Sequence, residues 1–286
     1  MNFDKIKSGV VELIKKAEIE LPEDVIVALK KAYDAEEGLA KIQLKNILSN
    51  IEVAKKTGRP LCQDTGVQTF FVKAGVDFPN VGHLKTVITD AVRTATEKVP
   101  LRPNAVDPFT KFNHADNVGE YIPAITWDFV EGNDVLITAI PKGAGSENMS
   151  KLVMLRPGVG LESVKDFVVD EVVSAGGNPC PPTVIGVGIG GGADLAMKLG
   201  KTALLRPVGV RHHDKKIADF ELELIKKINS TGIGPMGLGG KTTVLDVHVE
   251  KAPRHPASLP VGLVVQCWAD RRAAMIIHRD GSWEVK

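Results

Sequence analysis

One short polar stretch, residues 61–66, constrains the local fold of this chain more than any other feature. It reads Leu-Cys-Gln-Asp-Thr-Gly, it follows Pro60, and it ends at Gly66. Proline fixes its own φ and disfavours helix in the residue before it, while glycine permits a tight bend. The thiol, amide, carboxylate and hydroxyl of this stretch are therefore predicted to lie on a loop, where binding and catalytic groups are usually placed. A surface turn with an incidental cysteine is the alternative.

The sequence on either side of this loop predicts a mixed α/β fold with a helical N-terminal part. Apolar residues recur at helical spacing over residues 6–17, 25–29 and 38–56. β-branched and aromatic runs predict a strand at 67–72 and a β-hairpin formed by 124–130 and 135–140. The remaining expected elements are helices at 83–97, 161–175 and from residue 193, strands at 183–189, 243–249 and 263–266, and a terminal hairpin at 273–285.

Charge and hydropathy exclude several classes of function. The chain has 286 residues, and its 36 Lys and Arg nearly cancel its 35 Asp and Glu, which gives a formal net charge of +1. Such a balance carries no electrostatic footprint for nucleic acid or for a membrane surface. The longest apolar runs are far shorter than the about 20 residues that span a bilayer. The N-terminus alternates acids and lysines without an apolar signal core, so we expect a cytoplasmic protein.

Three cysteines, Cys62, Cys180 and Cys267, each lie at or just beyond the end of an expected element. An odd number of scattered cysteines is a poor disulfide framework. A structural zinc site would normally add a histidine or a fourth cysteine, and a thiol catalyst would need only one of the three. A cubane iron–sulfur cluster held by three thiolates would keep one iron open as a Lewis acid. The pattern therefore favours a shared ligand.

Three further segments present candidate groups. Arg102 lies between prolines in residues 99–108, where a stiff backbone would present the guanidinium to a carboxylate, although a solvated loop arginine is an equal alternative. Residues 142–148 contain two glycines, including Gly145, that would let backbone amides approach a ligand or would only serve a turn. His255 stands before Pro256 and is either an acid/base group or a polar loop residue.

Two glycine runs imitate nucleotide-binding motifs. Residues 183–192 contain a dinucleotide-type spacing, but a second strand with a ribose-binding acid is not evident. Residues 234–242 resemble a phosphate loop whose first glycine is one position too far away. Nucleotide binding would predict that ATP or NAD stabilises the fold, and we discount it.

Taken together, the motifs resemble the class I iron–sulfur fumarate hydratases and the related L-tartrate dehydratases. The resemblance runs in order through nearly the whole chain and rests on residues 61–66, 101–104, 142–147, 177–182, 254–256 and 266–267. It implies one domain over residues 1–286, with a helical region at 1–58 and a mixed α/β cluster-binding region at 59–286. Strand-end loops would converge on the cluster.

The same resemblance implies roles for individual residues. Cys62, Cys180 and Cys267 would bind a 4Fe-4S cluster whose unique iron holds the carboxylate and hydroxyl of the substrate. Gln63, Arg102 and Gly145 would contact the substrate, and the catalytic candidates are Asp64, as base or proton relay, and His255. Adding water across a double bond that is flanked by two carboxylates requires a cation to bind each carboxylate, a metal to activate the water, and a group that moves a proton at carbon.

The resemblance also implies a partner. Single-chain members of that family continue into a second catalytic domain, whereas this sequence ends at Lys286. We therefore expect the α subunit of a hetero-oligomer that needs a β subunit to hydrate fumarate to L-malate. An L-tartrate dehydratase α subunit is the nearest alternative. A non-enzymatic iron–sulfur or redox-sensing protein would bind a cluster without binding a dicarboxylic acid.

Overall fold

The computed structural model describes all residues 1–286, which form two compact units. Unit 1 comprises Met1–Pro22, Asn50–Gly143 and Arg271–Lys286, and unit 2 comprises Glu23–Ser49 and Ala144–Asp270. The expected helical N-terminal part is confirmed by α1 (Phe3–Ile19), α2 (Glu23–Ala35) and α3 (Gly38–Thr57). These helices are divided between the units: α1 belongs to unit 1, α2 to unit 2, and α3 to both.

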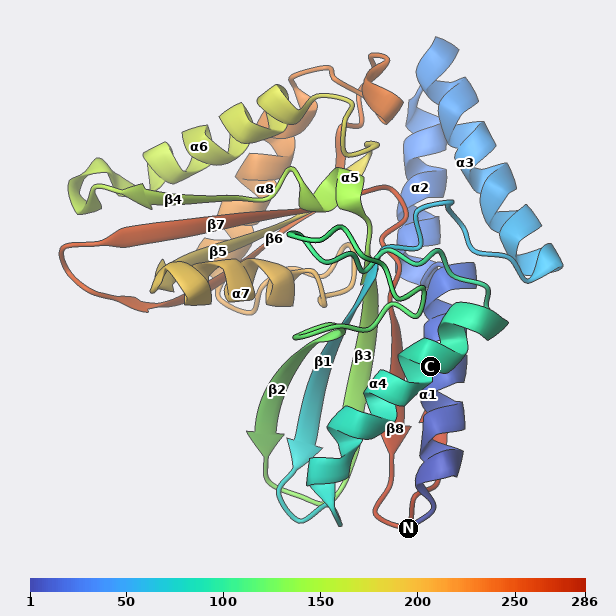
Figure 1. Ribbon diagram of the computed structural model, residues 1–286. Coiled ribbons are helices and arrows are strands. Elements are labelled where there is room, and N and C mark those ends of the chain that lie inside the picture. Colours follow the sequence, from blue (N-terminus) through green and yellow to red (C-terminus); the bar gives the residue numbers. More distant parts are fainter. The chain divides into compact units, whose positions relative to one another are not determined.

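Unit 1 is a five-stranded sheet covered on one face by helices. The strands run in the order β2 (Ala124–Val130), β1 (Val67–Gly75), β3 (Val135–Lys142), β8 (Ala273–Ile277) and β9 (Trp283–Val285). Figure 1 shows α1 and α4 (Leu84–Lys98) lying against this sheet, preceded by the short η1 (Val81–His83). Their apolar faces share one core with β1, β3 and β8. Burial of this amphipathic stripe, rather than helix propensity, fixes both helices.

The hairpin expected at 124–140 was wrong, because β1 lies between its two strands. β1 pairs with β2 in parallel and with β3 antiparallel. The connection at 131–134 crosses the end of β1, where the amide of Gly75 donates to the carbonyl of Asp134 and the amide of Asp77 donates to that of Gly132. A Cβ on Gly75 would lie 2.4 Å from the Gly132 carbonyl oxygen. Each of the two strands therefore pairs with β1 instead of with the other. The expected terminal hairpin, formed by β8 and β9, is confirmed.

Unit 2 is a four-stranded sheet with helices on both faces. Its strands run in the order β4 (Lys151–Leu155), β7 (Leu259–Gln266), β5 (Thr183–Gly191) and β6 (Val244–Arg254). One face is covered by α6 (Gly160–Ala175) and α8 (Lys215–Asn229), and the other by α7 (Ala193–Ala203) (Figure 1). The short elements are α5 (Ala144–Glu147), η2 (Pro157–Val159) and η3 (Pro235–Gly237). The mixed α/β class is therefore confirmed.

The first glycine run allows close helix packing. A Cβ on Gly186 would lie 2.1 Å from the carbonyl oxygen of Gly200 in α7, and a Cβ on Gly188 would lie 2.0 Å from that of Ala196. Real Cβ atoms do not approach a carbonyl so closely, so glycine is required for the helix to reach β5. This packing accounts for the run without a nucleotide.

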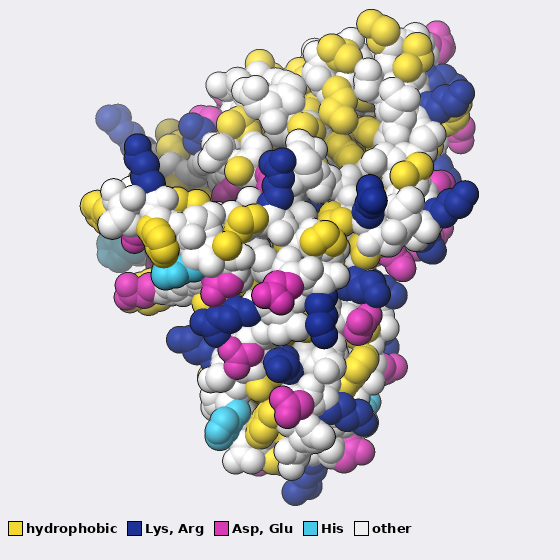
Figure 2. All heavy atoms as spheres, turned by 45° about the vertical axis from the view of Figure 1, so that its right-hand side comes forward, with side chains coloured by type: hydrophobic (Ala, Val, Ile, Leu, Met, Phe, Trp, Pro, Cys, Tyr) yellow, Lys and Arg dark blue, Asp and Glu magenta, His cyan; other side chains and the backbone are white.

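No helix is both long enough and apolar enough to cross a membrane. On the face shown in Figure 2, lysine and arginine side chains are interspersed with aspartate and glutamate, as the balanced charge of the sequence leads one to expect.

Candidate functional site

Asp64 is held from three sides inside unit 1. Its Oδ1 accepts a hydrogen bond from the Gly66 amide at 2.9 Å, an Asx turn that fixes χ1. Its backbone carbonyl accepts a hydrogen bond from Nη2 of Arg271 at 3.0 Å. Its Oδ2 faces Gly143, where an added Cβ would lie 3.0 Å away. The carboxylate therefore has a defined position on the loop that the sequence predicts.

Gly66 lets this loop approach the end of β3. Its φ is +68°, and an added Cβ would lie 2.6 to 2.8 Å from backbone atoms of Lys142. Both the left-handed conformation and the close approach exclude a side chain. The glycine expected only to permit a bend thus also seats the loop against β3.

The loop that carries Arg102 is joined to the loop that carries Asp64. The Thr65 hydroxyl accepts a hydrogen bond from the Arg102 amide at 3.0 Å, and the Asn104 side chain donates to the Gly66 carbonyl at 3.0 Å. Thr65 is buried, whereas Arg102 is exposed and its guanidinium makes no internal hydrogen bond or ion pair. The Asp64 carboxylate and the Arg102 guanidinium are therefore carried by two loops that are hydrogen-bonded to each other at Thr65 and Gly66.

A third residue in this region, Asn117, was not found from the sequence. It is buried and has a φ of +59°. Its Oδ1 accepts from the Asn104 amide at 2.6 Å, and its Nδ2 donates to the Arg102 carbonyl at 2.8 Å. Asn117 therefore fixes the backbone on both sides of Pro103. The only sequence signal was an asparagine in a polar loop, which is common.

A buried charged pair lies behind the Asp64 loop. Arg271 is 2% exposed and donates from Nη1 to Oε2 of Glu18 at 2.7 Å, while Glu18 is fully buried near the end of α1. The Gln68 side chain donates to Oε1 of Glu18 at 2.8 Å. Burial raises the pKa of Glu18 to about 7, and this effect outweighs the opposing influence of Arg271 and Gln68. Neither member of the pair is marked by a motif in the sequence.

Cys180 and Cys267 lie at the same edge of the unit 2 sheet. Cys180 precedes β5 and Cys267 follows β7, and these two strands are antiparallel neighbours in which Val184 pairs with Gln266. The Trp268 amide donates to the Cys180 carbonyl at 3.1 Å. The topology thus brings two of the three expected cysteine ligands to adjacent loops.

The second glycine run, residues 234–240, packs against the Cys180 loop. The Met236 amide donates to the Pro181 carbonyl at 2.8 Å, and a Cβ on Gly237 would lie 2.6 Å from the Cα of Gly177. Cys180 itself is exposed and has a φ of +56°, which is uncommon for a residue with a side chain. Such backbone outliers cluster at functional sites. The glycines at 234–240 therefore support the cysteine loop.

Gly145 lies in α5, next to the Cys180 loop. A Cβ on Gly145 would lie 3.4 Å from the carbonyl oxygen of Asn178, and Gly145 is exposed. The absence of a side chain thus lets α5 lie close to the Asn178 carbonyl.

His255 lies at the opposite end of β7 from Cys267. It is exposed, and its Nδ1 accepts a hydrogen bond from the Ala257 amide at 3.1 Å. The eight residues of β7 separate it from Cys267 by about 26 Å, at about 3.3 Å per residue. The structure does not place His255 beside the two cysteines of unit 2.

Cys62 and Gln63 lie in unit 1, with Cys62 partly buried and Gln63 exposed. The Cys62 thiol donates to Oε1 of Gln63 at 3.5 Å. None of the three cysteines forms a disulfide. Neither unit contains a group of three or more His, Cys, Asp or Glu side chains that could hold a metal ion.

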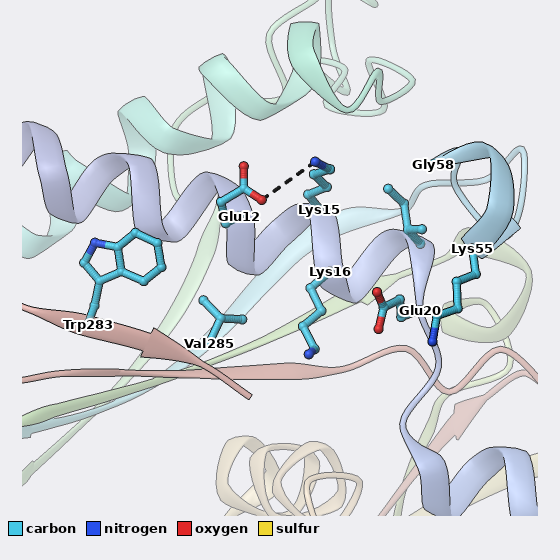
Figure 3. Close-up of a pocket in the computed structure, with 9 residues that line it drawn as sticks. Glu12, Lys15, Lys16, Glu20, Lys55, Gly58, Trp283 and Val285 are labelled. Atoms are coloured by element: carbon cyan, nitrogen blue, oxygen red, sulfur yellow. Dashed lines mark ion pairs between the residues drawn. The ribbon is translucent and has the colours of Figure 1, made fainter.

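A surface hollow of about 610 Å³ in unit 1 contains none of the expected site residues. Its lining comes from α1, from the residue that follows this helix, and from three other segments (Figure 3): Glu12, Lys15, Lys16 and Ile19, then Glu20, and Lys55, Gly58, Trp283 and Val285. Lys15 pairs with Glu12 at 3.8 Å. Because its charged groups are of both signs and mostly solvated, the hollow does not indicate a particular ligand.

Comparison with known proteins agrees with the motifs. Residues 7–276 match the family described as Fumarate hydratase (Fumerase). A chain of Methanocaldococcus jannaschii, provisionally named L(+)-tartrate dehydratase subunit alpha, is 53% identical over 281 residues, which cover 96% of this chain and 99% of that one. The L(+)-tartrate dehydratase subunit alpha of Escherichia coli K12 is 40% identical over 266 residues, which cover 92% of this chain and 88% of its own.

Proposed function

This chain belongs to the fumarate hydratase family, and on that basis we propose that it is the α subunit of a hydro-lyase acting on a four-carbon dicarboxylic acid. The observation that carries the proposal is the junction at Thr65, which ties the loop of Asp64 to the loop of Arg102. A group that can move a proton and a cation that can bind a carboxylate are the two parts that such a reaction requires of this chain.

Arg102 would bind one carboxylate of the substrate. Its guanidinium is exposed, has no internal partner, and is carried by a backbone fixed at Thr65 and Asn117. A planar guanidinium so presented binds a carboxylate through two parallel hydrogen bonds. Gln63 and the Gly145 amide are further candidates for contact with the substrate.

Asp64 would move the proton at carbon. Its Oδ1 accepts a hydrogen bond from the Gly66 amide, which orients the carboxylate, and its Oδ2 lies toward Gly143, the residue that follows β3. A fixed carboxylate within hydrogen-bonding reach of its substrate is the usual geometry of a general base. His255, on the exposed loop between β6 and β7, is the second candidate for moving a proton.

The cysteines fit an iron–sulfur cluster in their chemistry. All three thiols lie on loops at element ends and are outside disulfides, and two of those loops are hydrogen-bonded to each other. Cys62, Cys180 and Cys267 would hold a 4Fe-4S cluster, which when bound supplies an open iron as Lewis acid for the hydroxyl that is added or removed.

Fumarate, hydrated to L-malate, is the substrate that we propose first, in keeping with the description of the family. L-tartrate is the second candidate, and the names of the relatives favour it. Both acids present two carboxylates on adjacent carbons, which Arg102 would recognise equally. A β subunit would complete the site, since both relatives are named as alpha subunits.

The proposal is tested by anaerobic reconstitution with iron and sulfide, followed by EPR with and without fumarate, L-malate and L-tartrate. A cubane signal that shifts with one diacid would identify the substrate. A cluster that ignores all three acids, in the chain alone and in its complex with the β subunit, would leave a redox role instead. Full turnover by the chain alone would contradict the need for a β subunit.

A further inference from the structure

We propose that Glu18 and Arg271 form a positioning pair that sets the place of Asp64 for catalysis, although neither residue is itself expected to touch the substrate. This inference rests on the proposed function of Asp64. It concerns an internal contact whose effect on the loop can be measured without any substrate.

Arg271 connects the end of α1 to the Asp64 loop through two separate hydrogen bonds. Nη1 donates to the Glu18 carboxylate at 2.7 Å, and Nη2 donates to the Asp64 carbonyl at 3.0 Å. A guanidinium holds its two amino groups in one rigid plane, so the position of Glu18 determines the position of the Asp64 backbone. A lysine has one nitrogen and could not make both contacts with the same geometry.

Glu18 holds the same loop a second time. Its backbone carbonyl accepts a hydrogen bond from the Leu61 amide at 2.9 Å. Its carboxylate accepts from Gln68, whose amide group also lies 3.4 Å from the Thr65 carbonyl. Glu18 therefore holds the loop directly at Leu61. It also holds the loop indirectly, through Arg271 and Gln68, at the carbonyls of Asp64 and Thr65.

The cost of this arrangement argues for a role beyond folding. Glu18 is fully buried, and it stands in the last turn of α1, where the helix dipole disfavours a negative charge. Ion pairs buried in this way contribute little net stability compared with apolar side chains of similar size. A hydrogen-bonded pair such as Glu18 and Arg271 fixes a loop in one conformation better than an apolar contact does.

The arrangement also leaves little freedom for Asp64. The Arg271 Nη2 would lie 3.8 Å from a Cβ on Gly143, and the Asp64 Oδ2 would lie 3.0 Å from the same point. The guanidinium, the carboxylate and the glycine thus meet at one place. A shift of the Arg271 head would move the Asp64 backbone, and with it the carboxylate, relative to the end of β3.

The test is amide hydrogen exchange of the full-length chain carrying Arg271→Lys. This variant keeps the charge and most of the side-chain volume but loses one of the two contacts. The amides of Leu61 and Gly66, which donate to Glu18 and Asp64, should exchange at least about tenfold faster, the effect of losing one charge-assisted hydrogen bond. With the β subunit present, kcat should fall by about tenfold or more while KM changes less.

Arg206→Lys is the matched control. Arg206 is also largely buried and also joins two acceptors, in its case the carboxylates of Glu221 and Glu250, but it belongs to unit 2. It should leave the exchange of residues 61–66 at the wild-type rate. If Arg271→Lys does not fold, Glu18→Gln, which keeps the size of the side chain, replaces it with the same expected result.

Unchanged exchange at Leu61 and Gly66 in a folded Arg271 or Glu18 variant would overturn the positioning pair. Faster exchange of the loop with unchanged kcat would also overturn it, because the loop would then have moved without consequence. If the wild-type complex turns over no dicarboxylic acid, the proposed function fails, and the exchange result still reports whether the pair fixes the loop.

Discussion

The backbone amide of Trp268 donates a hydrogen bond to the carbonyl of Cys180 at 3.1 Å. This bond joins the loop that precedes β5 to the loop that follows β7, and it brings the second and third cysteines of the chain to one edge of a sheet. Cys180 and Cys267 are 87 positions apart in the sequence, and the pairing of β5 with β7, in which Val184 is opposite Gln266, brings their loops together.

Replacement of either cysteine in unit 2 should abolish cluster binding. Cys180→Ser and Cys267→Ser each remove one thiolate of the proposed set of three, and a hydroxyl does not replace a thiolate on iron. We expect iron and acid-labile sulfide to fall to background after anaerobic reconstitution. Ser174→Ala, on an exposed position of α6, serves as control. Retention of wild-type iron by Cys180→Ser would exclude this cysteine as a ligand.

Asp64→Asn should remove the acid/base group without disturbing the loop, since the amide oxygen can still accept from the Gly66 amide. Loss of a general base lowers kcat by about 100- to 10,000-fold. Iron content should stay at the wild-type level. Asp128→Asn, an exposed aspartate of β2, should have wild-type kinetics. An Asp64→Asn enzyme with normal kcat would assign the proton transfer to another group.

Gly143→Ala should displace the Asp64 carboxylate. The new methyl group would lie 3.0 Å from Oδ2, so the carboxylate must move by a few tenths of an ångström. Displacement of the proposed reacting group is expected to lower kcat by about tenfold. Gly82→Ala is the control, because nothing lies within 4 Å of its added Cβ. Equal kinetics for both variants would show that Asp64 tolerates the shift.

The stability of the protein should depend on pH through Glu18. Its pKa is raised from 4.5 to about 7 in the folded state, so the folded protein binds this proton more tightly than the unfolded chain does. The contribution is complete below pH 4.5 and is lost as the pH rises through 7, by on the order of 3 kcal/mol in total.

Glu18→Gln has no proton to lose and isolates this effect. The difference in unfolding free energy between wild type and Glu18→Gln, measured by urea denaturation at pH 4.5 to 8, should therefore slope downward with rising pH. A difference that is flat across this range would mean that the pKa of Glu18 is the same in the folded and unfolded states.

The sequence was informative where local chemistry determines structure. Prolines and glycines around residues 61–66 and 178–182 correctly predicted loops, and periodic apolar residues predicted most helices and strands. Helix α8 was missed although Ile217, Phe220, Leu224 and Ile228 recur at helical spacing in it and are buried. That helix could have been found from the pattern.

Long-range pairing set the limit of sequence reasoning. The hairpin at 124–140 failed because β1, some 60 residues away, lies between its strands. Glu18 and Arg271 are separated by 253 positions, and a glutamate in a lysine-rich helix carries no sign of burial.

The most direct test of the proposed hydro-lyase activity is the anaerobic turnover of fumarate and of L-tartrate by the cluster-loaded chain in complex with its β subunit. We expect one of these acids, fumarate first, to gain or lose water, and Asp64→Asn and Arg102→Met each to abolish the reaction in a complex with full iron content. A folded, cluster-loaded complex that converts neither acid would contradict it.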